Sequence, residues 1–368
     1  MRNSFLKLLK IQHPIFQAPL AGGGDTPALV GAVSNAGGLG FIGAAYLNPD
    51  QIRAAGAAVR ALTTSPFGIN LFAPSATATA TNDLERALGS VAPFYAELGL
   101  GNPPQPSAAQ HSFGDQLAAA LETGASVFSY TFGRLPAAAM RAIKDRGMHV
   151  VGTVTSVEEA IVLAQDGADA VIAQGSEAGG HRGTFLSDVG SGADVEYGMV
   201  GTMALVPQIA DAINLPVIAS GGIMDGRGIA AALTLGASAV QMGTAFLTCD
   251  ESGASKAYRD AIFKANENQT RLTRAFSGRP ARGIMNRFMT EIGKESPSPI
   301  LPFPLQNALT RPLRIAAAKQ DRAEFLSLWA GQGLRMARSQ SAAHLMQKLV
   351  AETQDAFAQV GDKMNEHP

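Results

Sequence analysis

A chain of 368 residues, 46% of them hydrophobic, is long enough to bury a large core, which predicts one large domain with a smaller appendage. Its 29 basic and 30 acidic residues nearly cancel, so no single-sign field favours nucleic acid or an anionic membrane, and small molecules are the expected partners. The single cysteine, Cys249, excludes an intrachain disulfide, and the interrupted apolar run 5–9 is too short for a signal peptide or a membrane span, so a cytoplasmic location is expected.

Eight short apolar runs recur along the chain, each bounded by glycine, proline or a polar turn. Most are continuously hydrophobic, as expected for a parallel sheet that is covered on both faces. Alanine-rich helical segments lie between them, such as 157–166, which Ser156 precedes as a helix N-cap. The repeated strand and helix predict an α/β fold, a TIM (β/α)8 barrel over residues 1–250. The expected strands are 15–19, 39–44, 67–72, 126–131, 149–155, 170–175, 216–222 and 239–246.

Two intervals between the expected strands are longer than one strand and one helix require. They predict an insertion at about 73–123 and a long loop at about 181–202. The residues after the last strand, 251–368, predict a second, mostly helical region that closes the barrel and covers the active site as a lid. Helices are expected at 323–338, where Trp329 would pack in a core, and at 342–360.

Glycines at the ends of the last two strands predict phosphate binding. The seventh run ends in Ser220-Gly221-Gly222 and the eighth contains Gln241-Met242-Gly243-Thr244, and these two strand ends hold phosphate in many TIM barrels. No glycine-rich nucleotide fingerprint follows the first strand, and the six histidines are scattered without metal-ligand spacing. A phosphorylated organic cofactor is therefore favoured over a metal.

The segment 175–183, Gly-Ser-Glu-Ala-Gly-Gly-His-Arg-Gly, places His181 in a glycine-rich turn directly after the sixth strand. Glycine lets a backbone approach a ligand closely, and the carboxyl ends of barrel strands are where catalytic groups lie. His181 is therefore the predicted acid or base, whereas Arg182 beside it is expected to be solvated.

Several of these motifs together resemble the nitronate monooxygenase family, formerly called 2-nitropropane dioxygenase, over nearly the whole chain. The last motif is similar to class I members of that family. The resemblance implies a non-covalently bound FMN and the oxidation of alkyl nitronates by molecular oxygen to carbonyl compounds and nitrite, in a monomer or homodimer. Propionate 3-nitronate is one candidate substrate. The motifs are QAPLAGG (17–23), SNAGGLG (34–40), GINL (68–71), the segment 175–183, ASGGI (219–223), QMGT (241–244) and LWAGQ (328–332).

The resemblance also implies roles for individual residues. His181 would be the catalytic residue beside the flavin ring. Asn70 and Gln174 would hydrogen-bond polar edges of the ring or the ribityl chain, a role that their amide groups suit. Ala18, Pro19 and Leu20 would form an apolar wall near the ring. The remaining residues expected at FMN are Gly179, Gly180, Ser220, Gly221, Gly222, Gln241, Met242, Gly243 and Thr244.

Two questions stay open at the level of the sequence. His181 could abstract the α-proton of a nitroalkane, or its protonated form could attract the oxygens of a nitronate that is already present. The alternative functions are a related FMN barrel that reduces a quinone or an enoyl thioester with NAD(P)H, and a flavin-free barrel that binds a phosphorylated ligand.

Overall fold

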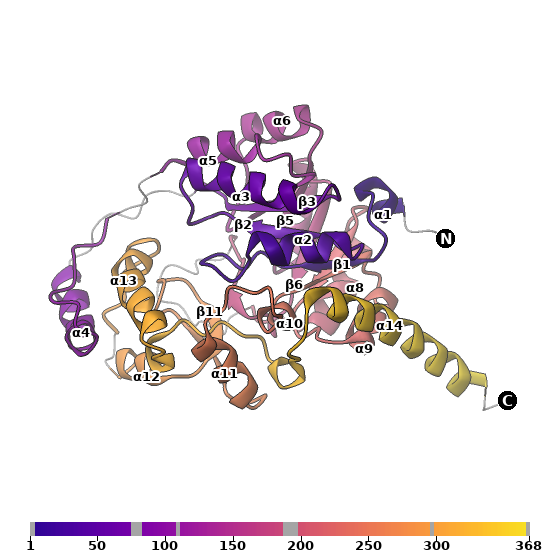
Figure 1. Ribbon diagram of the computed structural model, residues 1–368. Coiled ribbons are helices and arrows are strands. Elements are labelled where there is room, and N and C mark those ends of the chain that lie inside the picture. The colour runs from indigo at the N-terminus through magenta and orange to yellow at the C-terminus, as the bar shows by residue number, and fades with distance from the viewer. Residues whose placement is uncertain (1–3, 75–82, 108–110, 187–197, 295–297, 366–368) are drawn as a thin grey trace.

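The computed structural model describes residues 4–74, 83–107, 111–186, 198–294 and 298–365, and a barrel of parallel strands forms its centre (Figure 1). Eight strands lie side by side in the order β1-β9-β8-β6-β5-β4-β3-β2, and every neighbouring pair is parallel. Their bounds are Ile15–Gln17 (β1), Gly40–Gly43 (β2), Phe67–Phe72 (β3), Val127–Thr131 (β4), His149–Val154 (β5), Ala170–Gln174 (β6), Val217–Ser220 (β8) and Ala239–Met242 (β9).

The first and last strands of that order meet and close the sheet. Phe16 bridges Leu39 in parallel, and the Gln17 N–H donates to the Leu39 carbonyl at 2.9 Å. The side-chain oxygen of Gln17 also accepts from the Phe41 N–H at 3.0 Å, which ties β1 to β2 beyond the backbone bridge. The predicted TIM barrel is confirmed, and each of the eight predicted runs contains one of its strands.

Helices surround the barrel, as a parallel sheet buried on both faces requires. The predicted N-cap is confirmed, because the Ser156 hydroxyl accepts from the Glu159 N–H at 3.2 Å. The helix α5 comes from the predicted insertion and packs on α3. These helices are α2 (Pro27–Asn35), α3 (Pro49–Leu62), α5 (Phe113–Ala120), α6 (Ala137–Asp145), α7 (Val157–Gln165), α8 (Thr202–Ala212) and α9 (Gly226–Thr234).

The short helix α1 (Ser4–Leu9) lies at the amino-terminal end of the barrel strands. Its Phe5 and Leu9 are buried in one cluster with Phe16 and Phe41, which point into the barrel interior. The Phe5 and Phe16 ring centroids are 6.4 Å apart. Since α1 blocks this end, the opposite end, where the strands finish, is left for a ligand.

A second core lies beside the carboxyl end of the barrel, in the lower left of Figure 1. It joins α4, from the predicted insertion, to helices and a small antiparallel sheet from the carboxyl-terminal region. Phe94, Phe276, Phe288 and Phe325 are among its buried side chains. The elements are α4 (Leu84–Glu97), α11 (Lys256–Lys264), α12 (Arg287–Ile292), α13 (Leu305–Lys319), β10 (Thr270–Thr273), β11 (Ala281–Ile284) and β7 (Gly180–His181).

The two helices predicted after residue 320 have different outcomes. The segment 342–360 is helical and forms part of α14 (Ala342–Asn365), which packs on α9 and α2 and so completes the ring of helices. The predicted helix 323–338 is wrong, since only two short turns form there, Ala323–Phe325 and Leu334–Met336. Between them Trp329 bridges Gly283 of β11, and the Leu328 carbonyl accepts from the Ile284 N–H at 2.8 Å. Pairing with the small sheet thus replaces helical hydrogen bonds.

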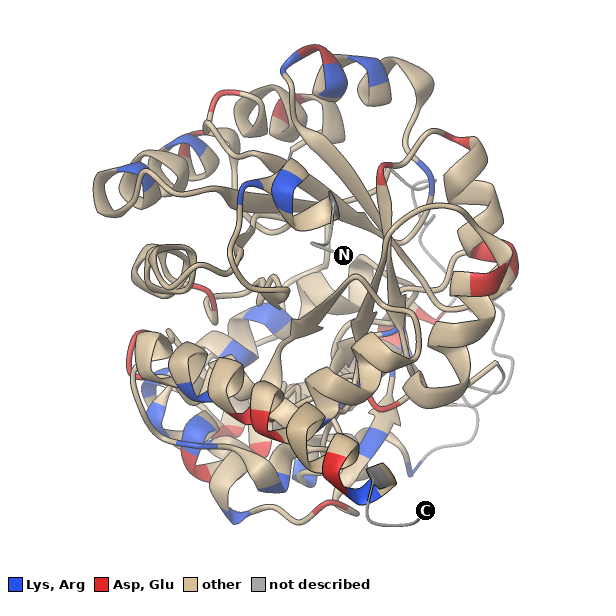
Figure 2. Ribbon diagram, turned by 90° about the vertical axis from the view of Figure 1, so that its right-hand side faces the viewer, with Lys and Arg blue, Asp and Glu red and all other residues tan. Residues whose placement is uncertain are grey.

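The surface carries both signs of charge. Lys and Arg positions are interspersed with Asp and Glu positions on the helices in Figure 2. Among the described residues, no helix is long and apolar enough to cross a membrane.

Candidate active site

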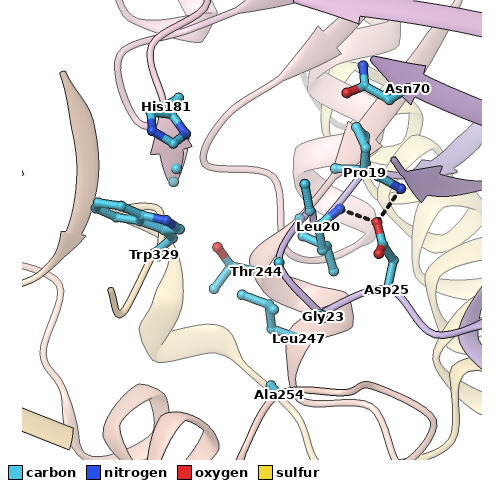
Figure 3. A pocket seen from close by; sticks show the side chains of 18 of the residues that line it. Pro19, Leu20, Gly23, Asp25, Asn70, His181, Thr244, Leu247, Ala254 and Trp329 are labelled. Atoms are coloured by element: carbon cyan, nitrogen blue, oxygen red, sulfur yellow. Dashed lines mark hydrogen bonds between the residues drawn. The ribbon is translucent and has the colours of Figure 1, made fainter. Parts of the chain in front are cut away.

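A cavity of about 630 Å³ opens at the carboxyl ends of the barrel strands, between the barrel and the second core. The structure brings every residue predicted for the site to the wall of this one cavity, and Figure 3 shows several of them from close by. They are Ala18, Pro19, Leu20, Asn70, Gln174, Gly179, Gly180, His181, Ser220, Gly221, Gly222, Gln241, Met242, Gly243 and Thr244.

One end of the cavity is built from backbone. Gly221 and Gly222, directly after β8, have φ values of 120° and 72°, which residues with side chains rarely adopt. Gly243 and Thr244 follow β9, and the short helix α10 (Thr244–Leu247) begins there. This end therefore offers backbone without side chains at three glycines, as an approaching phosphate requires.

The carboxyl-terminal region supplies a third wall to the same end. The Gly331 N–H donates to the Thr244 hydroxyl at 3.0 Å, and both Gly331 and Gly333 line the cavity. A Cβ on Gly331 would lie 2.7 Å from the Glu177 carbonyl oxygen, so the segment is pressed against the loop after β6. These two glycines were missed by the residue-level prediction, although the LWAGQ motif pointed to their neighbourhood.

Two residues on barrel strands, Asn70 and Gln241, bring acceptor atoms to the cavity wall. Asn70, within β3 and 3% exposed, donates its amide to the Ser129 hydroxyl at 2.9 Å, which leaves its oxygen available. The buried side-chain oxygen of Gln241, on β9, has no hydrogen-bond partner among the described residues. A buried acceptor without a donor is costly, so this wall suits a ligand that carries N–H or O–H groups.

Gln174 has a different placement from Asn70 and Gln241. Its amide nitrogen donates to the His181 carbonyl at 2.9 Å, and its amide oxygen accepts from the Gly183 N–H at 2.8 Å. Gln174 thus lines the cavity and at the same time fixes the backbone on both sides of Arg182.

His181 lies in a strand, and not in the glycine turn expected from the sequence. It pairs with Ala281 as part of β7, so the small sheet of the second core holds its backbone. Its Nε2 lies 2.8 Å from the hydroxyl oxygen of Ser277, which is 2% exposed. Ser277 was missed by sequence reasoning because it lies far along the chain with no pattern that ties it to His181.

Four aromatic rings enclose the imidazole of His181. The ring centroids of Phe132 and Trp329 lie 5.6 Å from it, and those of Phe72 and Phe303 lie 6.4 Å from it. Burial, helped by the charges of Arg279 and Arg314, lowers the pKa of His181 to about 3. The imidazole is therefore neutral at working pH.

Phe132 itself is held in an unusual backbone conformation. Its φ of 77° is an outlier for a bulky residue, and such strain concentrates at ligand sites. The guanidinium carbon of Arg279 lies 4.1 Å from the centroid of the Phe132 ring, and Arg279 also donates to the Thr184 carbonyl at 2.7 Å. These contacts brace the aromatic wall from behind.

The expectation that Arg182 is solvated is wrong. Only 6% of it is exposed, and its guanidinium donates to the carbonyls of Gln174 at 2.7 Å and Gly198 at 3.0 Å. The nearby carboxylate of Glu159, 1% exposed, accepts from the Thr155 N–H and the Thr184 hydroxyl. Arg182 is drawn inside because the loop around His181 has carbonyls that need donors.

Asp25 is a titratable residue of the cavity that the sequence did not single out. One of its carboxyl oxygens accepts from the Leu20 N–H at 2.7 Å and from the Gly43 N–H at 2.6 Å, and the bond to Leu20 is dashed in Figure 3. Burial, opposed by these bonds, raises the pKa of Asp25 to about 7. Asp25 clamps the loop that carries Pro19 and Leu20 to the end of β2.

One face of α13 forms the remaining wall. Asn307, Arg311, Arg314, Ile315 and Ala318 all line the cavity, and Tyr46 lines it from the loop after β2. Among the described residues no group of three or more His, Cys, Asp or Glu side chains could hold a metal ion.

Comparison of the sequence with known proteins identifies the family of this chain. The model of the nitronate monooxygenase family matches residues 2–352. A probable nitronate monooxygenase from Staphylococcus aureus (strain MRSA252) is 42% identical over 349 residues, which cover 95% of this chain and 96% of the relative.

Two solved structures are similar over almost their full lengths. A nitroalkane oxidase from Streptomyces ansochromogenes is 39% identical, with a TM-score of 0.89 and coverage of 97% of this chain and 99% of that chain. FabK from Thermotoga maritima is 30% identical, with a TM-score of 0.76 and coverage of 99% of both chains. The chain thus belongs to the nitronate monooxygenase family and is an oxidoreductase that acts on a small molecule.

Proposed function

We propose that the protein is an FMN-dependent nitronate monooxygenase, which oxidises alkyl nitronates with molecular oxygen to carbonyl compounds and nitrite. The observation that carries the proposal is the placement of His181, a neutral imidazole among four aromatic rings, on the same cavity as the glycine-lined ends of β8 and β9. Membership of the family and the likeness to a nitroalkane oxidase support it.

The residues of the cavity fit FMN. Gly221, Gly222, Gly243 and Thr244 would hold the phosphate with backbone N–H groups and a hydroxyl. The unpartnered oxygen of Gln241 and the free oxygen of Asn70 would accept from the ring or the ribityl chain. Ala18, Pro19 and Leu20 would cover the ring, with Gln174, Gly179, Gly180, Ser220 and Met242 completing the contacts.

When bound, FMN would supply the chemistry that accepts electrons from the nitronate and passes them to oxygen. The protein supplies position and a dry chamber. Phe72, Phe132, Phe303 and Trp329 surround His181 and keep water from the reacting carbon. His181 is held through Ser277 on its ring and through Gln174 on its carbonyl.

The low pKa of His181 bears on the substrate. A base works best when its pKa lies near the working pH, and a pKa of about 3 makes His181 a weak base for the α-proton of a nitroalkane. A neutral imidazole can still donate one hydrogen bond to a nitro oxygen. We therefore infer that the nitronate, which has already lost that proton, is the preferred substrate.

Oxygen uptake tests this function. We expect the yellow, FMN-loaded protein to consume oxygen rapidly with ethyl nitronate, more slowly with nitroethane at equal concentration, and not to consume NADH. His181→Asn should lower kcat at least tenfold and leave FMN bound, as judged by the visible spectrum. Full activity of His181→Asn on nitronates would contradict the role of His181, and anaerobic bleaching of the flavin by NADH would instead favour a reductase.

A further inference from the structure

A nitronate brings a negative charge into a chamber walled by aromatic rings. An unpaired charge is expensive in such a place, so the protein must provide a counter-charge. His181 does not provide it, because burial and neighbouring arginines lower its pKa to about 3. Among the described residues that line the cavity, the remaining cationic side chains are Arg311 and Arg314, both on α13.

Arg314 is the more enclosed of the two, and its own bonds leave its charge unmatched. Its Nη2 donates to the side-chain oxygen of Asn307 at 2.7 Å and to the Asn307 carbonyl at 3.3 Å, and its Nη1 lies 3.5 Å from the Ser327 hydroxyl. Its buried Nε has no partner among the described residues. All of these contacts are to neutral groups.

Among the described residues, no carboxylate is one of the groups that act electrostatically on Arg314. Burial lowers the pKa of Arg314 to about 10. Of the groups that act on it, Arg311 is the charged one at neutral pH, because burial keeps the phenols of Tyr46 and Tyr95 protonated. Arg279 is different, since the field of Glu159 offsets part of its burial. The guanidinium of Arg279 also lies over the Phe132 ring and donates to the Thr184 carbonyl, and Arg279 is not among the residues that line the cavity. Within the part of the chain that the structure describes, Arg314 alone combines an unmatched buried charge with a place on the cavity.

Arg314 and His181 line the same cavity. The charge of Arg314 is one of those that lower the pKa of His181. Tyr46 lines the cavity with Arg314, and its ring lies near the His181 side, since its centroid is 5.5 Å from that of Phe72, which is 6.4 Å from that of His181. The Tyr46 hydroxyl, whose pKa burial raises, stays protonated, and Tyr46 lines the same cavity as Arg314, so it offers a second donor to a ligand there.

We propose that Arg314 is the residue that holds the negative charge of the substrate, with the oxygens of a nitronate against its guanidinium and the Tyr46 hydroxyl as a second donor. The inference rests on the proposed nitronate activity and assigns separate roles in it to Arg314 and His181. Arg314 binds the anion, and His181 stays a neutral group beside the reacting carbon. A planar guanidinium suits the two coplanar oxygens of a nitronate, as it suits a carboxylate.

Binding of nitrate, a planar oxyanion that cannot be oxidised, tests the proposal without turnover. Calorimetric titration of the FMN-loaded protein with sodium nitrate, in chloride-free buffer of low ionic strength, gives Kd. The variants are Arg314→Met, Arg314→Lys and His181→Asn, with Arg271→Gln as control because Arg271 is exposed on β10, away from the cavity wall. Thermal melting of each variant checks that it is folded.

We expect Arg314→Met to raise the Kd for nitrate at least tenfold, and Arg314→Lys, which keeps a charge but loses the planar fork, to fall between it and the parent. His181→Asn and Arg271→Gln should stay within twofold of the parent. In turnover, Arg314→Met should mainly raise KM, whereas His181→Asn should mainly lower kcat.

Three results would overturn the proposal: no binding of nitrate to the parent protein, an unchanged Kd in Arg314→Met, or a tenfold loss in His181→Asn without one in Arg314→Met. The proposed activity fails in a different way. A protein that binds nitrate through Arg314 but consumes no oxygen with any nitronate would keep the anion site and lose the monooxygenase function.

Discussion

Burial shifts the pKa values of two cavity residues, His181 and Asp25, in opposite directions for one physical reason. It disfavours the charged form in both, so the pKa of His181 falls to about 3 and the pKa of Asp25 rises to about 7. At neutral pH His181 is uncharged and Asp25 is close to half protonated. The cavity thus carries little negative charge of its own, which favours an anionic substrate.

Asp25 gives a prediction about stability and pH. Because its folded pKa lies above the unfolded value of 3.8, its contribution to stability is fully present below about pH 4 and is lost as the pH rises through 7. Asp25→Asn keeps an oxygen for the Leu20 and Gly43 N–H groups but cannot ionise. The free energy of unfolding of Asp25→Asn relative to the parent should therefore rise between pH 4 and pH 8, by at most about 4 kcal/mol.

Urea unfolding at pH 4, 6 and 8 measures this difference. A difference that stays constant over that range would show that the Asp25 carboxyl is not buried as described.

At the scale of elements, the loop after β6 packs tightly against the segment before α14, at Gly179 and Ala330. A Cβ on Gly179 would lie 2.5 Å from the backbone of Ala330 and Gly331. Gly179→Ala should therefore force the two segments apart, lower the free energy of unfolding by about 1–3 kcal/mol and displace His181. Chemical unfolding and kcat measure the two effects.

Gly89, in α4, is the matched control for that change. A Cβ there meets nothing within 4 Å. Gly89→Ala should stabilise the protein by about 0.5–1 kcal/mol because alanine favours the helix, and it should leave kcat unchanged. Equal effects of the two changes would contradict the close contact at Gly179.

The same elements explain what the sequence could predict. The barrel strands and their glycine ends were predictable because short apolar runs and turn glycines are local signals. The antiparallel sheet of β7, β10 and β11 was not, since it joins His181 to a strand far along the chain. The apolar spacing of 323–338 imitates a helix, but Trp329 pairs with Gly283 instead, and tertiary contact overrides the local pattern.

The residues of the candidate site likewise fall into those that the sequence could predict and those that only the fold identifies. Those that lie in a barrel strand or just after it, such as Asn70 in β3 and Thr244 after β9, were predictable from their place in the barrel. Arg314 and Gly331 reach the cavity, and Ser277 reaches His181, only through the packing of the second core. No periodicity or motif marks Ser277 or Arg314 as a neighbour of His181, and the LWAGQ motif points to the region of Gly331 without showing what it contacts, so the folded chain is needed to identify them.

For the whole molecule, FMN should stabilise barrel and second core together, because the proposed phosphate end includes both Thr244 and its partner Gly331. FMN at one hundred times its Kd should add about 2.7 kcal/mol of stability. For 368 residues this corresponds to a rise in Tm of about 3 °C. Riboflavin, which lacks the phosphate, should give a smaller rise at equal concentration, and an equal rise would contradict the assignment of the glycine ends to phosphate.

The contact between Trp329 and β11 can form only after the barrel strands have been synthesised on the ribosome. All eight barrel strands precede residue 243, whereas Trp329, Gly331 and α14 are made later. At about 5–20 residues per second, a growing chain therefore carries its barrel strands for several seconds before the aromatic chamber and the last outer helix can form. A nascent chain in that interval has the strand ends that we propose for FMN but no enclosed place for substrate, so the proposed reaction would need the complete protein.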